Sequence, residues 1–451
     1  MTGSEIKTRS KELLKISIPM AIEHISVSLM GMFSIMLISY FVGEYATSAL
    51  GMVDAITHLI LALFAALTTG GTIIVSQYMG RQDRSSAKRA GGQAIMLSTV
   101  ASLIMFVVIF VFRDQILNLL FSEAEAAVME AARTFLTIMN FSYPVVAVTL
   151  TVFGIIRGTG DTFAPMVISL IMNCFNLILG IILIGALDLG VYGAAWALTI
   201  SKVVGLVCAG WFLTRKAKNL RINKFKYFKP DFGRQKAILR LGLPTSFESG
   251  LFQAGRLITQ VMIVTISTAA IAANTIGFTI MNFSNVPGMA LATGTMILVG
   301  QRVGRGETHD VIKTSMFSIG MGFVFLMVLG LLIILLRNPI FATFNPTAET
   351  MEYLPTIIIS YLLIAPFFWP ASFVLPACLR ATGDVVYPMI VSISTMFAVR
   401  IALGFVFGIL LGMGIAGVWI GMYLDWVARS AFFIPRMLRG KWKGKGLKTG
   451  D

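Results

Sequence analysis

"RGTGDTFAPM" spans residues 157–166 and "RATGDVVYPM" spans residues 380–389, and six of the ten letters agree in place. The two stretches lie 223 positions apart in a chain of 451 residues, so the repeat distance is about half of the chain. Two more matches have nearly the same offset: "ISIPMAIE" (16–23) with "LGLPTSFE" (241–248), and "TGGTIIVSQYMGRQD" (69–83) with "TGTMILVGQRVGRGE" (293–307). Matches in one order at one offset indicate an internal duplication.

The repeated stretch is typical of a turn between two helices. In each copy an arginine ends the preceding helix, a glycine supplies the turn conformation, and an aspartate is placed to cap the next helix. The arginine is also placed to pair with that aspartate. We interpret these residues as a structural turn rather than a substrate site: Arg157, Gly160, Asp161, Arg380, Gly383 and Asp384.

The composition indicates an integral membrane protein. Hydrophobic residues make up 57% of the chain and charged residues only 13%, with a mean hydropathy of +0.84. Residues 94–112 and 315–336 hold nineteen and twenty-two letters without a charge, and each run is long enough to cross a bilayer as a helix. The expected spans are 13–42, 46–79, 88–112, 128–155, 162–187, 191–214, 237–266, 269–303, 312–336, 351–378, 385–410 and 414–435.

The duplication divides these twelve helices into two lobes of six. An even number of crossings returns the chain to the side where it started, so the two lobes form a parallel repeat. The predicted fold class is therefore all-α, with twelve transmembrane helices in two parallel-repeat six-helix lobes. The predicted domains are residues 1–214, a basic linker at 215–236, and residues 237–451.

The distribution of charge gives an orientation. Basic residues outnumber acidic ones in the segments 81–89, 215–236 and 436–448, whereas segments 113–133, 186–190 and 337–352 are acidic or neutral. The positive-inside rule then places the basic segments and both termini in the cytoplasm. The net charge of +15 is spread over separate loops, so we expect contact with membrane lipids and no nucleic-acid site. Cys174, Cys208 and Cys378 lie in apolar segments and lack metal-ligand spacing.

The sequence resembles the multidrug and toxic compound extrusion (MATE) transporters in three features. These are the doubled R-x-x-G-D turn, the "GR" pairs at 80–81 and 304–305, and the two six-helix lobes. The resemblance implies a secondary antiporter, not an enzyme, that expels cationic amphipathic small molecules while H⁺ or Na⁺ runs inward. It implies two lobes around a cavity that opens alternately to either side. We expect a monomer in the inner membrane of a bacterium, with no cofactor beyond the coupling ion.

The chain departs from the family at its best-known acidic positions. Where many members have an aspartate in the first helix, this sequence has Ser34, and an N-x-x-x-D pattern of the fifth helix becomes Asn176 and Gly180. On the seventh helix Phe252 stands where other members have a glutamate, and Glu248 lies one turn earlier. The family's coupling residues therefore do not transfer directly.

Ionisable residues inside the spans are costly, so each needs a reason. Glu23 and Glu248 occupy the same place in each repeat, one turn after a proline, and no basic residue follows at i+4. We predict that Glu248 is the main coupling or substrate carboxylate, with a Na⁺ ion as one candidate ligand, and that Glu23 is its counterpart. Further candidates for coupling or substrate binding are His24, Ser34, Asp54, Asn173, Asn176, Gln253, Arg256, Asn274 and Asn282.

Other interpretations stay open for several of these groups. Asp54 and His58 lie on one helix face and form either a local pair or a functional one. Arg256, Arg400, Lys202 and Asp425 are interpreted as interhelical pairs that hold a lobe together. The amides are either cavity-lining groups or interhelical hydrogen-bond partners.

The sequence leaves three other functions to compare with transport of cationic compounds. A major-facilitator transporter also has two parallel six-helix lobes, but the Arg-Thr-Gly-Asp turns are not expected there. A lipid-linked sugar flippase of the wider superfamily would favour cationic residues such as Arg256 and Arg400 in its cavity. An intramembrane enzyme is disfavoured because the sequence holds only three histidines and no H-E-x-x-H or G-x-S-x-G pattern. No P-loop is present, so pumping is expected to use an ion gradient.

Overall fold

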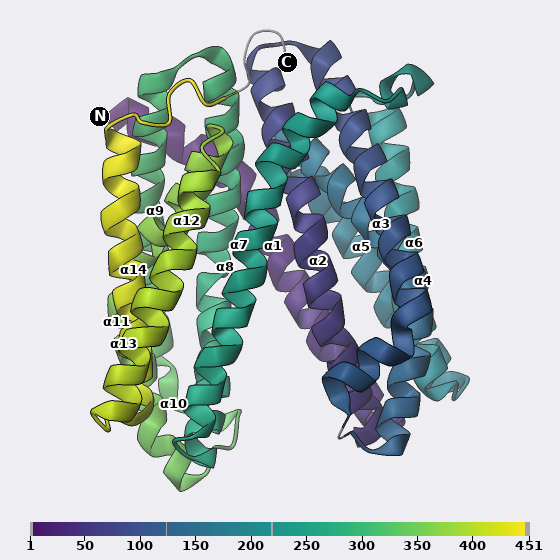
Figure 1. The fold of residues 1–451 in the computed structure, drawn as a ribbon, viewed down its shortest axis with the longest axis vertical. Coiled ribbons are helices and arrows are strands. Elements are labelled where there is room, and N and C mark those ends of the chain that lie inside the picture. Colours follow the sequence, from purple (N-terminus) through teal and green to yellow (C-terminus); the bar gives the residue numbers. More distant parts are fainter. Residues whose placement is uncertain (1–2, 123, 218–219, 447–451) are drawn as a thin grey trace. The chain divides into compact units, whose positions relative to one another are not determined.

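The computed structural model describes residues 3–122, 124–217 and 220–446, so parts of the predicted linker and tail (218–219 and 447–448) lie outside the described residues. Within these ranges the chain is helical and contains no strand. The first half holds α1 (Gly3–Phe41), α2 (Glu44–Gly80), α3 (Arg84–Phe121), α4 (Ala126–Gly158), α5 (Phe163–Gly180) with the π-helix η1 (Ile181–Ala186), and α6 (Gly190–Trp211) with η2 (Phe212–Lys216) (Figure 1).

A short 3₁₀ helix, η3 (Phe225–Phe228), lies in the basic segment between the halves. The second half holds α7 (Phe232–Val264), α8 (Thr268–Arg305), α9 (Thr308–Leu335), α10 (Arg337–Ala342), α11 (Ala348–Ala381), α12 (Val386–Thr395), η4 (Met396–Ile401), α13 (Ala402–Phe405), η5 (Val406–Leu410) and α14 (Gly414–Leu438). The run from α12 to η5 is one continuous helical span.

Ten helical spans of the described chain are long and apolar enough to cross a membrane. The other two long helices, α7 and α14, contain 33 and 25 residues, which is sufficient length, but neither holds an equally apolar stretch. The prediction of an all-α fold with twelve long helices is thereby confirmed.

Two predicted helix boundaries are wrong. Helix α1 begins at Gly3 rather than near residue 13, and α3 continues to Phe121 rather than ending at residue 112. Phe112 has a non-helical backbone (φ −103°, ψ 15°), so the predicted end coincides with a kink. The helix goes on because the segment after the kink is amphipathic and buries Leu117 completely.

Helix neighbours repeat between the halves. In the first half α2 packs against α3 and α4, α4 packs against α3 and α6, and α5 packs against α6. In the second half α8 packs against α9 and α11, α11 packs against α9 and α14, and the span from α12 to η5 packs against α14. The same six-helix arrangement is therefore built twice, as the sequence repeat predicts.

The chain nevertheless divides into packing units inside helices rather than between halves. One unit contains Ile22–Ser246, and the other contains the chain up to Ala21 and from Phe247 onward. The start of α1 buries Ile16 and Met20 against α8 of the second unit. The start of α7 packs on α2, where the Ser246 hydroxyl donates to the Ala62 carbonyl at 3.1 Å. The predicted domain boundaries separate the two sequence repeats, whereas the packing units are defined by contacts in space. The predicted boundaries therefore stay a prediction.

The doubled turn has the expected backbone. Gly160 and Gly383 adopt φ values of 92° and 90°, in the left-handed region that favours glycine. The Asp161 carboxylate accepts from the Ala164 backbone N–H at 3.1 Å and so caps α5. Asp384 does not cap its helix; it pairs instead with the side chains of Arg436 and Lys445, at 2.9 and 2.8 Å.

We expect Gly383→Ala to destabilise the protein more than Gly306→Ala. Both glycines have positive φ, so both alanines carry a strain of about 1–2 kcal/mol. A Cβ on Gly383 would also collide with the Lys445 backbone carbonyl, whereas a Cβ on Gly306 would meet nothing. Thermal unfolding of the detergent-purified variants measures the difference. Equal losses of stability would contradict the close packing of the tail against this turn.

Candidate functional site

Each of the two predicted glutamates forms an ion pair with the arginine of the repeated turn in its own unit. Arg157 Nη2 lies 2.5 Å from Glu23 Oε1, joining α4 to α1. Arg380 Nη2 lies 2.7 Å from Glu248 Oε2, joining α11 to α7 in the same way. These four side chains keep only 11–17% of their surface exposed.

These pairs correct two expectations. The sequence suggested that each arginine pairs with the aspartate of its own turn, but Arg157 and Arg380 reach the glutamates instead. The glutamates also lacked a basic residue at i+4, yet each finds a partner on another helix. The pairs leave polar atoms unsatisfied among the described residues, because Glu23 Oε2, Arg157 Nε and Arg380 Nε are buried without a hydrogen bond. The neighbouring His24 is exposed.

In the first unit, α5 amides contact α1 serines. Asn176 donates to Ser34 Oγ at 3.2 Å and Asn173 donates to Ser26 Oγ at 2.9 Å. Ser34 and Asn176 also line a narrow cavity closed by Gly180 and apolar side chains. Ser34 and Gly180, the two positions that replace the family's carboxylates, therefore line one cavity. The neutral hydrogen bond between Asn176 and Ser34 stabilises the contact between α1 and α5.

A second charged group in this unit lies on α2 and α6, without an ion pair within 4 Å among the described residues. Asp54 interacts electrostatically with His58 on its own helix and with Lys202 on α6. Nearby, the hydroxyls of Thr57 and Tyr143 lie 3.0 Å apart. The Asp54–His58 pair was predicted from spacing, whereas Lys202 was an unforeseen partner because it lies far away in the sequence.

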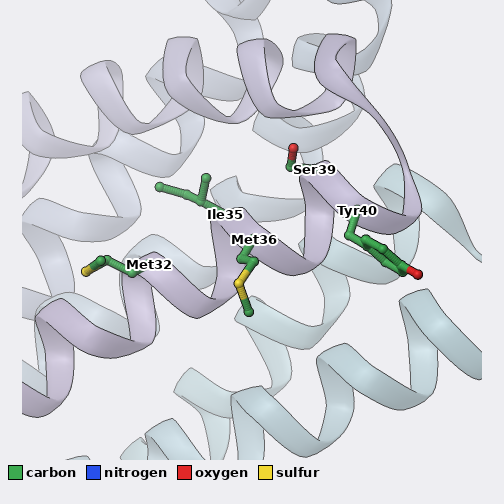
Figure 2. A pocket seen from close by; sticks show the side chains of 5 residues that line it. All are labelled: Met32, Ile35, Met36, Ser39 and Tyr40. Carbon is green, nitrogen blue, oxygen red and sulfur yellow. The ribbon is translucent and has the colours of Figure 1, made fainter. Parts of the chain in front are cut away.

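An apolar stripe on α1 forms a pocket of the first unit. Figure 2 shows Met32, Ile35, Met36, Ser39 and Tyr40 on successive turns of the helix. The three side chains at i, i+4 and i+8 are strongly exposed, with values of 57% for Met32, 59% for Met36 and 81% for Tyr40. Methionine adapts its shape to varied apolar partners, so this stripe offers a permissive contact surface.

The second unit contains a buried group of charges on different helices. Asp425 and Arg429 form an ion pair along α14, with 2.9 Å between Oδ1 and Nε. Arg400, on the π-helix η4, is also buried and lies over the Phe252 ring at 5.7 Å. Arg429 lies over the same ring at 5.3 Å. We call Arg400, Asp425, Arg429 and Phe252 the arginine cluster.

The sequence missed Arg429, although its i+4 spacing from Asp425 was a readable signal. Arg256 is exposed on α7, where it lies over Phe278 and donates to Gln253 Oε1 at 3.4 Å. Asn274 is buried and bonds to Gln260 and Trp419, so its interhelical interpretation fits. Asn282 is exposed on α8.

The described residues contain no group of three or more histidine, cysteine, aspartate or glutamate side chains that could hold a metal ion. The candidate sites are therefore two repeated ion pairs, a neutral Ser34–Asn176 contact, the α1 stripe and the arginine cluster. Nothing in these groups resembles a nucleophile with an adjacent base.

The match to a known protein family occurs once in each half of the chain. The MatE family model matches this chain twice, over residues 19–182 and 244–406. A relative named probable multidrug resistance protein NorM, from Thermotoga maritima, is 25% identical over 99% of this chain and 96% of that protein. The multidrug export protein MepA of Staphylococcus aureus is 25% identical over 83% of this chain and 82% of its own length.

Solved structures show the same fold. An outward-facing multidrug resistance MATE family transporter of the MOP superfamily has a TM-score of 0.89 at 20% identity, covering 96% of this chain and 97% of that one. A MOP superfamily transporter from Pyrococcus furiosus has the same TM-score and identity, covering 97% and 96%. The double match of the family model covers more than half of the residues, and the chain belongs to the MatE family of membrane transporters.

Proposed function

We propose that this protein exports cationic amphipathic compounds in exchange for H⁺ or Na⁺, by alternating access between its two lobes. The observation that carries the proposal is the family match in both halves, together with relatives named for multidrug resistance and multidrug export. The sequence holds no P-loop, so an ion gradient is the energy source. The major-facilitator alternative is not kept, because the family is established.

The α1 stripe supports a broad substrate range. Met32 and Met36 present flexible, polarisable side chains, and such surfaces repack around different ligands. Tyr40 adds an aromatic face that attracts an organic cation. A cationic amphipathic drug would place its apolar part against the two methionines and its charged group over the Tyr40 ring.

The repeated ion pairs support a coupling role. A carboxylate that pairs with arginine can instead bind a proton or Na⁺, and each exchange changes which helices are held together. Occupation of Glu248 by the coupling ion would release Arg380, and the same event at Glu23 would release Arg157. Coupling then follows because the ion and the ion pair compete for one carboxylate.

Energy-dependent efflux of a cationic dye from proteoliposomes, under separately imposed Na⁺ and pH gradients, tests the proposal. Efflux driven by at least one gradient is expected. Absence of efflux under both gradients, with correctly folded protein, would contradict it.

We expect Glu248→Gln to lower stability by about 3 kcal/mol, because it leaves Arg380 buried without its carboxylate. The double variant Glu248→Gln with Arg380→Gln should recover much of this loss, since no charge then remains. The coupling role predicts that the double variant folds but no longer responds to either gradient. Thermal unfolding and dye efflux, measured on the same preparations, separate the two effects.

The matched control is Glu23→Gln with Arg157→Gln, which removes the equivalent pair of the other unit. It should weaken gradient-driven efflux less than the Glu248 double variant does. If the Glu248 double variant transports at the wild-type rate under every gradient, the Glu248–Arg380 pair has no coupling role and serves only to join α7 to α11.

The orientation proposed for the protein places the termini and the basic segments in the cytoplasm of a bacterial cell, with a monomer as the working unit. Impermeant thiol reagents added outside intact cells should fail to label cysteines placed at Ser86 and Asn223, and should label one placed at Ala126. Labelling from permeabilised cells provides the control for reactivity. The reverse pattern would overturn the orientation.

The arginine cluster favours a second candidate, a transporter of negatively charged cargo such as a lipid-linked sugar. Its buried members carry two arginines against one aspartate. The Pyrococcus furiosus neighbour is described as having a binding pocket of reverse polarity that suggests a different function. An anionic dye in the same efflux assay distinguishes this cargo from a cationic one.

A further inference from the structure

The arginine cluster lies at the middle of its helices. Arg400 is the fifteenth residue of the 25-residue span Val386–Leu410, and Asp425 and Arg429 are the twelfth and sixteenth residues of the 25-residue α14. Charges at this depth are expensive unless they are neutralised. The three side chains are nevertheless almost fully buried, with exposed fractions of 4%, 0% and 3%.

Asp425 forms an ion pair with only one of the two arginines, and its Oδ2 atom is buried without a hydrogen bond. Arg429 donates to Asp425 Oδ1 through Nε and to the Ser392 carbonyl through Nη2, at 2.9 and 3.2 Å. In the described part of the chain, the Arg400 guanidinium forms neither an ion pair within 4 Å nor a hydrogen bond, and its Nε is buried without a partner. Arg400 is therefore a buried cation with no carboxylate within 4 Å among the described residues.

The surroundings of Arg400 add positive charge. Arg429 and Arg256 both act on it electrostatically, and Asp425 is the acidic group that acts on it. The flat Phe252 ring supports both guanidinium groups from one side. Arg256 is exposed, so the group extends from the surface of α7 into the interior of the unit. An anion that entered there would meet three arginines and one aspartate.

The cluster belongs to one half alone. At the repeat offset of 223, Arg400 and Arg429 correspond to Leu177 and Leu206. Arg400 also lies in the π-helix η4, whereas the corresponding residues 173–178 of the first half lie in the regular helix α5. Single π-helical turns inside α-helices frequently mark functional sites. The first half therefore has leucine at both arginine positions and Lys202 at the position of Asp425.

We propose that Arg400, with Arg429 and Arg256, forms a binding site for the carboxylate or phosphate group of an amphipathic ligand in the second packing unit. The proposal rests on the second candidate function, transport of negatively charged cargo, and names the group that is recognised: a carboxylate or phosphate on an amphipathic ligand. Guanidinium groups suit these anions because their N–H donors match two acceptor oxygens at once. An anion at Arg400 would provide the hydrogen bonds that its guanidinium lacks.

Binding of two matched probes tests the site. 4-(Pyren-1-yl)butanoate and 4-(pyren-1-yl)butyltrimethylammonium share one apolar body and differ in charge. Energy transfer to pyrene from the native tryptophans, among them Trp426 of α14, reports binding to protein in phosphatidylcholine nanodiscs, with empty discs subtracted. Wild-type protein should prefer the butanoate. Arg400→Gln should weaken butanoate binding by about tenfold, the usual worth of a hydrogen bond to a charged group, and should leave the cationic probe unaffected.

Three variants make the result specific. Arg305→Gln removes the same charge from an exposed position at the end of α8 and should change neither affinity. Arg400→Lys keeps the charge without the planar donor pair and should recover part of the butanoate affinity. If Arg400→Gln does not fold, the exposed Arg256→Gln provides the same comparison, with a loss of about threefold from one screened charge.

Competition separates two sources of the anion. Displacement of the butanoate by farnesyl phosphate at lower concentration than by glutarate indicates a lipid phosphate, and the opposite order indicates a soluble organic anion; either order supports the site. Equal wild-type affinity for both probes, or an unchanged butanoate affinity in folded Arg400→Gln, would overturn it. Selective binding by a protein that pumps no dye would instead count against transport and leave the site standing.

Discussion

A charge inside a membrane protein is costly without an opposite charge or a polar partner, and the Glu–Arg pairs remove this cost at the start of each half. Glu23 and Glu248 each lie on the helix that begins a repeat, and Arg157 and Arg380 each end the fourth helix of that repeat. The arginine reaches the glutamate only if its helix ends at the right depth. The left-handed glycine three residues later then turns the chain into the next helix. The repeated motif therefore encodes the contact between helices one and four as well as a turn.

The two halves diverge where such pairs are not required. In the first unit the polar contact of the fifth helix is neutral, between Ser34 and Asn176. In the second unit the helical span from α12 to η5 carries Arg400 in its π-helical segment η4. A fold built twice can keep its structural pairs in both copies and change the remaining interior positions independently. The fifth helix of the first unit therefore makes a neutral contact through Asn176, whereas the corresponding span of the second unit carries the buried Arg400.

Hydropathy and the repeat predicted the number of helices and the glycine conformations, because both depend on local sequence. The partners of buried charges were harder to predict. Arg429 was not predicted as the partner of Asp425, although their i+4 spacing was a local signal. No local rule connects Glu248 to an arginine 132 residues away. Residue 112 was predicted as a helix end because the charge after it resembles a loop, whereas burial of Leu117 continues the helix. Long-range packing decided each of these cases.

Helices α1 and α7 each belong to both packing units, and charges hold α1 on both sides of the division. Near its start, Arg9 pairs with Asp310 and Glu12 pairs with Arg302 in the second unit. Beyond Ala21 the same helix belongs to the first unit, where Glu23 holds it to Arg157. Pro19 lies between these two attachments, and a proline removes one hydrogen bond of the helix ladder. Helix α1 is therefore held by ion pairs within each packing unit, and Pro19 lies between the two sets of attachments.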